Sequence, residues 1–184
     1  MVLLVVDTQK ALVNDQLYLY EKYVDNIKRL ISKARERGIE VIYVIHDDGP
    51  GSELTQGQPG FEIDEEFKPL SSEKVFIKNV NSAFKNTGLR EYLVKKNQQE
   101  VIVVGLQTDK CINATVISGF EHGFHMIIPA YANSTVDNDY MDSEKSYMYF
   151  NDFMWNGRYG ECVSVEEMIQ RMDKRKTFKK AYKN

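Results

Sequence analysis

The sequence predicts a three-layer α/β/α sandwich around a mostly parallel sheet. Short runs rich in Val and Ile recur along the chain, and they are apolar throughout rather than alternating. Such runs are typical of parallel strands that are covered on both faces. Segments with helical periodicity separate the runs, and this alternation favours an α/β sandwich. The length of 184 residues fits one domain, which we assign to residues 1–172.

Six apolar runs are predicted to be strands. The first, "VLLVV", begins directly after the initial Met and stops at an aspartate. The predicted strands cover residues 2–6, 40–45, 74–78, 100–104, 125–128 and 161–164.

Five segments are predicted to be helices. In "YVDNIKRLISKARERG", residues 23–38, apolar side chains recur at helical spacing and Gly38 supplies a stop. Further helices are predicted over residues 89–96, 112–122 and 143–156. The last helix follows Ser164, which has the S-x-x-E spacing of a capping box with Glu167.

Two segments interrupt this alternation. Residues 46–73 form a long connection rich in Gly and Pro, and long loops of this kind are usually functional or disordered. We interpret this loop as a lid or a pocket wall. The final segment 173–184, "DKRKTFKKAYKN", is strongly basic with few apolar residues, and we expect a solvated tail.

Composition and charge exclude several classes of partner. The net charge is −3, which gives no general attraction to polyanions and argues against a nucleic-acid partner. No stretch approaches the roughly 20 apolar residues of a membrane span, so no membrane partner is expected. The opening apolar run is too short for a signal peptide, and the two cysteines lie far apart in the chain. We therefore expect a cytoplasmic protein.

Chemically active side chains follow several of the predicted strands. Asp7 follows the first strand, His46 the second, Lys78 closes the third, and Cys111 comes after the fourth. In parallel α/β sheets, ligands bind outside the carboxyl ends of the strands. The sequence thus brings an acid, an amine and a thiol to one edge of the sheet. Asp7 could instead cap a helix or bind an ion, and Lys78 could be an exposed strand end.

The position of Cys111 allows two readings. At the start of a helix, unpaired N–H groups and a nearby ammonium would lower the pKa of the thiol and favour the nucleophilic thiolate. Alternatively, Cys111 is a small buried hydrophobic residue, which is the commonest fate of a free cysteine. Cys162 lies inside a predicted strand, where structural burial is expected.

His46 is a rival partner for the thiol, because Cys–His pairs are common in thiol enzymes. His46, Asp47 and Asp48 could also suggest a metal site, although two carboxylates and one imidazole in a Gly-rich turn are more often turn chemistry. No Gly-rich phosphate-binding motif follows a strand, which argues against a nucleotide cofactor.

Four motifs together resemble the isochorismatase-like cysteine hydrolases, over most of the chain. These are "LLVVDTQ", "YVIHDDGPGSELTQGQPGFEI", "KNVNSAF" and "VVGLQTDKCINAT". The combination of Asp after the first strand, K-x-x-x-SAF and G-x-x-T-D-x-C is more specific than any one motif. The resemblance implies a Rossmann-like sandwich, the isochorismatase-like hydrolase fold, and a homo-oligomer, either a dimer or a tetramer.

The resemblance also implies roles for individual residues. It places a catalytic triad at Asp7, Lys78 and Cys111, a cis peptide bond between Leu106 and Gln107, and an oxyanion hole made by the N–H groups of Gln107 and Cys111. The substrate pocket is expected to involve Gln9, Phe61, Phe84 and Leu106.

No cofactor and no metal are expected from the resemblance. Nicotinamidases in the family hold zinc through an Asp-x-His motif after the second strand. Here Asp47 fits the Asp position, but Gly49 stands at the His position. A zinc site needs about three protein ligands, which this turn does not supply.

The function implied is hydrolysis of a small amide, ureide or related C–N bond through a thioester, with a small molecule as substrate. The isochorismatase branch, which hydrolyses a vinyl ether, is one alternative. A catalytically silent small-molecule binder on the same fold is another.

Overall fold

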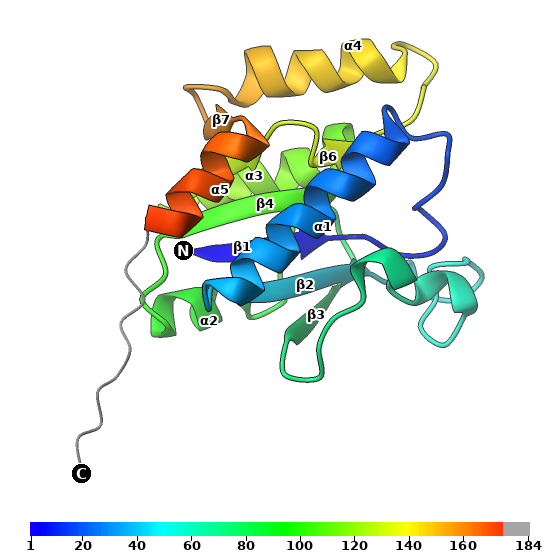
Figure 1. Cartoon of the computed structure of the whole chain (residues 1–184). Coiled ribbons are helices and arrows are strands. Elements are labelled where there is room, and N and C mark those ends of the chain that lie inside the picture. Colours follow the sequence, from blue (N-terminus) through cyan, green and yellow to red (C-terminus); the bar gives the residue numbers. More distant parts are fainter. Residues whose placement is uncertain (175–184) are drawn as a thin grey trace.

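A parallel sheet forms the middle layer of the protein in the computed structural model, which describes residues 1–174 (Figure 1). The strand order is β3-β2-β1-β4-β5-β7, and β6 pairs with β4 beside this path. The seven strands are β1 (Val2–Val6), β2 (Glu40–His46), β3 (Lys74–Lys78), β4 (Glu100–Leu106), β5 (His125–Pro129), β6 (Asn133–Ser134) and β7 (Glu161–Val163). The six predicted strands are confirmed, and β6 is an addition of two residues, too short for a hydrophobic pattern to reveal.

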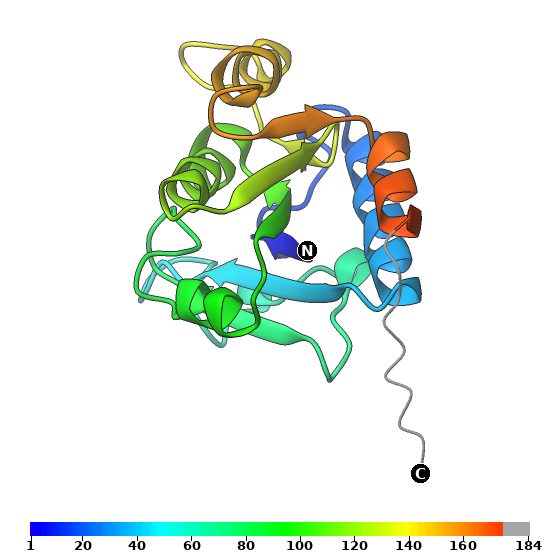
Figure 2. The same ribbon diagram turned by 90° about the vertical axis from the view of Figure 1, so that its left-hand side faces the viewer.

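Helices cover both faces of the sheet. They are α1 (Tyr20–Glu36), α2 (Leu89–Lys95), α3 (Asn113–Glu121), α4 (Ser143–Met148) and α5 (Val165–Lys174). Figure 2 shows α1 and α5 on one face and α2 and α3 on the other, so the predicted three-layer α/β/α class is confirmed. Within residues 1–174, every helix is too short or too polar to cross a membrane.

Alternate residues of β1 enter the two halves of the core. Leu3 and Val5 pack with the apolar side of α1, whereas Val2, Leu4 and Val6 pack with residues beneath α2 and α3. All five side chains are fully buried. This two-sided burial explains why the run is apolar throughout instead of alternating, and it makes β1 the centre of the fold.

Two predicted helices begin or end differently from expectation. The chain already coils at Thr108 as a wide π-helical turn, Thr108–Ile112, that leads into α3. Cys111 therefore lies on this turn and not in the first turn of an α-helix. The segment 143–156 is also divided, because α4 ends at Met148 and a π-helical stretch, Tyr149–Trp155, follows it. Apolar periodicity does not reveal a π-helical turn, because such turns are short insertions that involve too few residues to change the overall pattern.

The capping box before α5 has its expected contact. The amide N–H of Glu167 donates to Ser164 Oγ at 3.0 Å. The helix continues through Asp173 and Lys174, so the first two residues of the predicted basic tail are helical. The remainder of that tail, 175–184, lies outside the described residues.

The long loop 46–73 is attached to the end of β1. It contains two short 3₁₀ turns, Pro59–Phe61 and Glu65–Phe67. The N–H of Asp64 donates to the carbonyl oxygen of Thr8 at 2.8 Å, and Ile63 forms an isolated bridge with Gln9. These contacts hold the loop against the carboxyl edge of the sheet.

Candidate active site

Four side chains reach the carboxyl edge of the sheet from adjacent elements. Asp7 directly follows β1, His46 ends β2, Lys78 ends β3, and Cys111 lies on the π-helical turn after β4. The register pairs His46 with Lys78. Asp7 has a left-handed backbone with φ of 51°, a conformation that Asp adopts more readily than most residues. Its N–H donates to Val44 at 2.8 Å, which fixes the chain where it leaves β1.

The ammonium of Lys78 joins the other three side chains. Its Nζ lies 2.8 Å from Asp7 Oδ2, 2.9 Å from His46 Nδ1 and 3.2 Å from Cys111 Sγ. The side chains of Lys78 and Asp7 are buried. An ammonium has three N–H donors and no acceptor, so these three contacts satisfy its hydrogen-bonding capacity. The residues expected to form a triad are therefore in mutual contact.

Burial controls the protonation of the thiol and the carboxyl. It raises the pKa of Cys111 to about 12, and the negative charge of Asp7 adds to this effect while Lys78 opposes it. Burial also raises the pKa of Asp7, against the attraction of Lys78. The lowered thiol pKa predicted from the sequence is wrong, because desolvation of the thiolate outweighs one ammonium. The resting thiol keeps its proton.

A proton acceptor lies beside that thiol. Within residues 1–174, Asp7 Oδ1 is buried and accepts no hydrogen bond, whereas Oδ2 is bound to Lys78. The carboxylate thus has an oxygen available for a proton. A thiol with a raised pKa needs such a base at the moment it attacks.

A cavity of about 250 Å³ opens in front of the thiol. It is lined by Asp7, Leu12, His46, Asp48, Leu54, Asn81, Gln107, Lys110 and Cys111. Asn81 and Lys110 were missed by the sequence reasoning. Asn81 Oδ1 lies 3.7 Å from Cys111 Sγ, and its place in the "KNVNSAF" motif was the signal that could have found it.

The four residues expected to shape the substrate pocket lie elsewhere. Gln9 is fully buried, and its carboxamide is engaged with the backbone of His46 and Phe61. Leu106 belongs to the core beneath α1. Phe84 stacks on Phe124 with 5.5 Å between ring centroids. None of Gln9, Phe61, Phe84 and Leu106 lines the cavity beside Cys111.

His46 does not contact the thiol directly, because its Nδ1 is engaged by Lys78. Its other nitrogen, Nε2, lies 2.8 Å from Asp48 Oδ1. The arrangement favours Lys78 over His46 as the cationic partner of Cys111. It also shows that His46 belongs to the cluster, which the interpretation of "HDDG" as an ordinary polar turn did not predict.

A metal ion would have to compete with Lys78 for this cluster. One ligand atom each from Asp7, His46 and Cys111 lie within 4.8 Å of one another, a spacing that could surround a cation. The ammonium already contacts all three at 2.8 to 3.2 Å. Asp47, the residue at the zinc-ligand position of the motif, instead accepts from the N–H of Gly49 at 2.9 Å. The ligand atoms of Asp7, His46 and Cys111 are thus already bound to the ammonium of Lys78.

The segment before the thiol has the expected backbone. The peptide bond between Leu106 and Gln107 is cis. The carbonyl oxygen of Gln107 accepts from the N–H groups of Lys110 and Ile112, each at 3.1 Å, and Gln107 lines the cavity.

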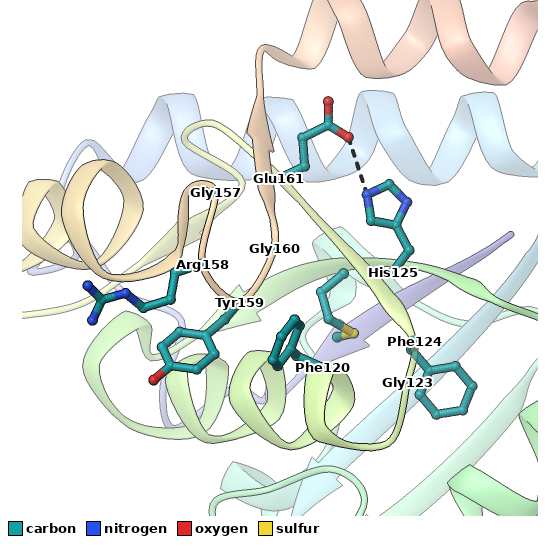
Figure 3. Close-up of a pocket in the computed structure, with 10 residues that line it drawn as sticks. Phe120, Gly123, Phe124, His125, Gly157, Arg158, Tyr159, Gly160 and Glu161 are labelled. Carbon is teal, nitrogen blue, oxygen red and sulfur yellow. Dashed lines mark ion pairs between the residues drawn. The ribbon is translucent and has the colours of Figure 1, made fainter.

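A second hollow lies at the opposite edge of the sheet, around the amino ends of β5 and β7 (Figure 3). Tyr159 packs edge-on against Phe120, with 5.6 Å between ring centroids. His125 lies 3.4 Å from Glu161, whose carboxylate is also bound by Arg171. The carboxylate of Glu161 is thus already paired with two basic side chains, and no thiol lines the hollow. The edge that carries Cys111 is the better candidate for an active site.

Comparisons with known proteins identify the family of the chain. The Isochorismatase domain matches residues 1–156. The uncharacterized isochorismatase family protein YrdC of Bacillus subtilis is 35% identical over 126 residues, which are 66% of this chain and 67% of that protein. The ureidoacrylate amidohydrolase RutB of Yersinia enterocolitica is 25% identical over 191 residues and covers 83% of each chain. A crystal structure from Chromobacterium violaceum, assigned to the isochorismatase family, has a TM-score of 0.88 at 25% identity, over 94% of this chain and 93% of that chain. With the same domain, the same fold and most of its length in common with these proteins, the chain belongs to the isochorismatase family of hydrolases.

Proposed function

We propose that this protein is a cysteine-dependent hydrolase of a small amide, ureide or related C–N bond. The observation that carries the proposal is the contact of a thiol, a carboxylate and an ammonium at Lys78, beside a cavity of about 250 Å³. This volume suits a small molecule.

Acylation begins with a proton transfer from Cys111 to Asp7. The thiolate sulfur attacks the carbonyl carbon as the proton leaves, and a tetrahedral intermediate forms. The intermediate collapses with cleavage of the C–N bond, and Asp7 returns its proton to the leaving nitrogen. A thioester on Cys111 and a free amine or ammonia result.

Deacylation uses the same carboxylate. Asp7 removes a proton from water, the hydroxide attacks the thioester, and the carboxylic acid leaves as Asp7 returns the proton to Cys111 sulfur. Lys78 stabilises both negative charges in turn, because its ammonium contacts Asp7 and Cys111 at 2.8 and 3.2 Å.

The tetrahedral intermediates need donors for their oxyanion. The N–H groups of Gln107 and Cys111 are proposed for this role. Support comes from the position of both residues at the cavity. Loss of one such donor typically costs about 100- to 1,000-fold in kcat.

Amide chemistry is favoured over ether hydrolysis for two reasons. A thiol paired with a carboxylate base suits attack on a carbonyl carbon. In addition, a relative that is similar over most of both chains is an amidohydrolase of a ureide, ureidoacrylate. The proposal takes this substrate class, and not the individual substrate, to the present protein.

The test is a screen for ammonia release across small primary amides and ureides, run with the wild-type protein and a Cys111→Ala variant. We expect release with at least one ureide or amide and none with Cys111→Ala. Trapping of an acyl adduct on Cys111 by mass spectrometry would identify the intermediate. Cleavage that continues in Cys111→Ala, or conversion of a vinyl ether without any amide turnover, would contradict the proposal.

A further inference from the structure

His46 is fixed at four points, which is unusual for a residue at the start of a long loop. Its backbone N–H donates to Gln9 Oε1 at 2.8 Å, and its carbonyl oxygen accepts from Gln9 Nε2 at 2.9 Å. Its ring contacts Lys78 through Nδ1 at 2.9 Å and Asp48 through Nε2 at 2.8 Å. Both the backbone and the ring of His46 are therefore held in one orientation.

The two ring contacts fix one tautomer. The ammonium of Lys78 can only donate, so Nδ1 of His46 must be the acceptor. In a neutral ring the proton then resides on Nε2, where it is donated to Asp48 Oδ1. The other oxygen of Asp48 accepts from Ser52 Oγ at 2.9 Å, which orients the carboxylate toward the ring.

We infer that His46 is a positioning residue for catalysis: it aims the Lys78 ammonium at Cys111 and Asp7 by accepting its third hydrogen bond. This inference rests on the proposed function, in which Lys78 stabilises the thiolate. It assigns Asp48 the task of holding His46 in the accepting tautomer.

The number of N–H donors on Lys78 matches the number of acceptors around it. Lys78 has three N–H groups, and its three acceptors come from Asp7, His46 and Cys111. Cys111 sulfur is the weakest of these acceptors. Without the imidazole, an N–H directed at His46 would be left without its partner in a buried site, and the ammonium could turn away from the sulfur toward better acceptors.

Two substitutions of His46 test its ring contacts to Lys78 and Asp48 one at a time. In His46→Asn, the carboxamide oxygen reaches the place of Nδ1 and can accept from Lys78. In His46→Gln, the longer carboxamide reaches the place of Nε2 and can keep the contact to Asp48 alone. The probe is iodoacetamide, with the alkylation rate of Cys111 followed by mass spectrometry and that of Cys162 as the internal reference.

We expect His46→Gln to slow alkylation of Cys111 relative to Cys162 by about tenfold to a hundredfold, the loss expected when a charged donor loses one hydrogen bond. His46→Asn should stay within about threefold of the wild type, because an amide oxygen accepts as a ring nitrogen does. Asp47→Asn is the matched control in the same turn, since the side chain of Asp47 accepts from the backbone N–H of Gly49 and is not bound to the ring of His46.

Equal rates in His46→Gln and the wild type, or a loss in His46→Asn as large as that in His46→Gln, would overturn the inference. Thermal melts establish that each variant is folded, and if His46→Gln does not fold, His46→Asn decides, because a loss of about tenfold or more in that variant would overturn the inference. Alkylation needs no substrate, so the positioning role can hold even where the amide screen fails, and the two failures are distinguishable.

Discussion

At the scale of single residues, the site depends on two buried groups that both resist losing a proton to water. Burial raises the pKa of the Cys111 thiol to about 12 and raises the pKa of Asp7 above its usual value. A preformed thiolate is therefore not the source of reactivity. In the proposed mechanism, the proton passes from sulfur to carboxylate as the sulfur attacks, and a carboxylate with a raised pKa is the stronger base for this transfer.

Replacing that base is a direct test. Asp7→Asn should reduce alkylation of Cys111 by iodoacetamide at least about tenfold, since general-base assistance typically contributes about 100-fold or more. Cys162 is the control, because burial raises its pKa to about 12 as well but it has Asp152 and Glu161, not Asp7, as its charged neighbours. Labelling rates of the two tryptic peptides give the answer. Equal rates in Asp7→Asn and the wild type would remove Asp7 from the role of base.

Under the proposed function, the same carboxyl is expected to set an acid limit on activity. Asp7 accepts a proton only when it is ionised, so turnover should fall as the pH falls through its folded-state pKa. Because burial raises that pKa from the ordinary 3.8, half of the activity should be lost above pH 3.8. A pH profile of kcat/KM on an amide substrate measures this midpoint. A midpoint at or below the ordinary carboxyl value would show that burial does not control Asp7.

The ion pair between Asp7 and Lys78 also affects stability. Lys78→Met would leave a buried carboxylate without its partner, and breaking a buried pair in this way costs about 3–5 kcal/mol. The double variant Asp7→Asn with Lys78→Met removes both charges and should recover much of the loss. Urea unfolding of the wild type and both variants gives the free energies. A single variant as stable as the wild type would contradict the burial of the pair.

At the scale of elements, the junction of β1 and β4 depends on a glycine. Gly105 pairs with Val6 and has φ of 123°. A Cβ at this position would lie 1.9 Å from the carbonyl oxygen of Val6. No side chain fits without separating the two central strands directly below the nucleophile's turn.

Gly105→Ala is expected to destabilise the protein by more than about 4 kcal/mol, in the class of severe backbone and packing defects. Gly123→Ala is the matched control. Gly123 also has a positive φ, of 84°, but a Cβ there would meet nothing within 4 Å, so only about 1–2 kcal/mol of left-handed strain is expected. Urea unfolding separates the two, and similar losses for both would contradict the role of the close approach to Val6.

The elements themselves were largely predictable from the sequence. Strands such as β1 are buried on both faces, and their unbroken apolar runs report this directly. The π-helical turn at Thr108–Ile112 and the short strand β6 were not predictable, because each depends on hydrogen bonds between segments and not on local periodicity. Asn133 of β6, for example, accepts from Thr108 Oγ1 at 2.7 Å and is bound to Asn151 on the other side.

At the scale of the whole molecule, parallel topology explains which site residues the sequence could identify. Asp7, Lys78 and Cys111 follow strands, so they reach one edge whatever the details of packing. The cavity residues Asn81 and Lys110 depend on the path of loops and on side-chain rotamers, which no local pattern fixes. The same reason explains why Phe84, expected in the pocket, packs against Phe124 instead.

The residues of the site come from strands at different positions in the sheet. Lys78 lies on β3, the edge strand, whereas Asp7 follows β1 at the centre of the sheet. Among residues 1–174, β3 pairs with β2 alone, and Val75 and Ile77 are 43% and 45% exposed. An edge strand with so little buried apolar surface should open locally at a lower free energy than the core strands.

Local opening of β3 would take the lysine out of the cluster while the rest of the molecule stayed folded. Amide hydrogens of β3 should therefore exchange with deuterium faster than those of β1, and mild urea should abolish amide turnover before the global unfolding transition. Exchange in β3 as slow as in β1 would rule this out. If β3 opens first, inactivation begins at the edge of the sheet. The ammonium of Lys78 then leaves the cluster reversibly, before the core is exposed to water.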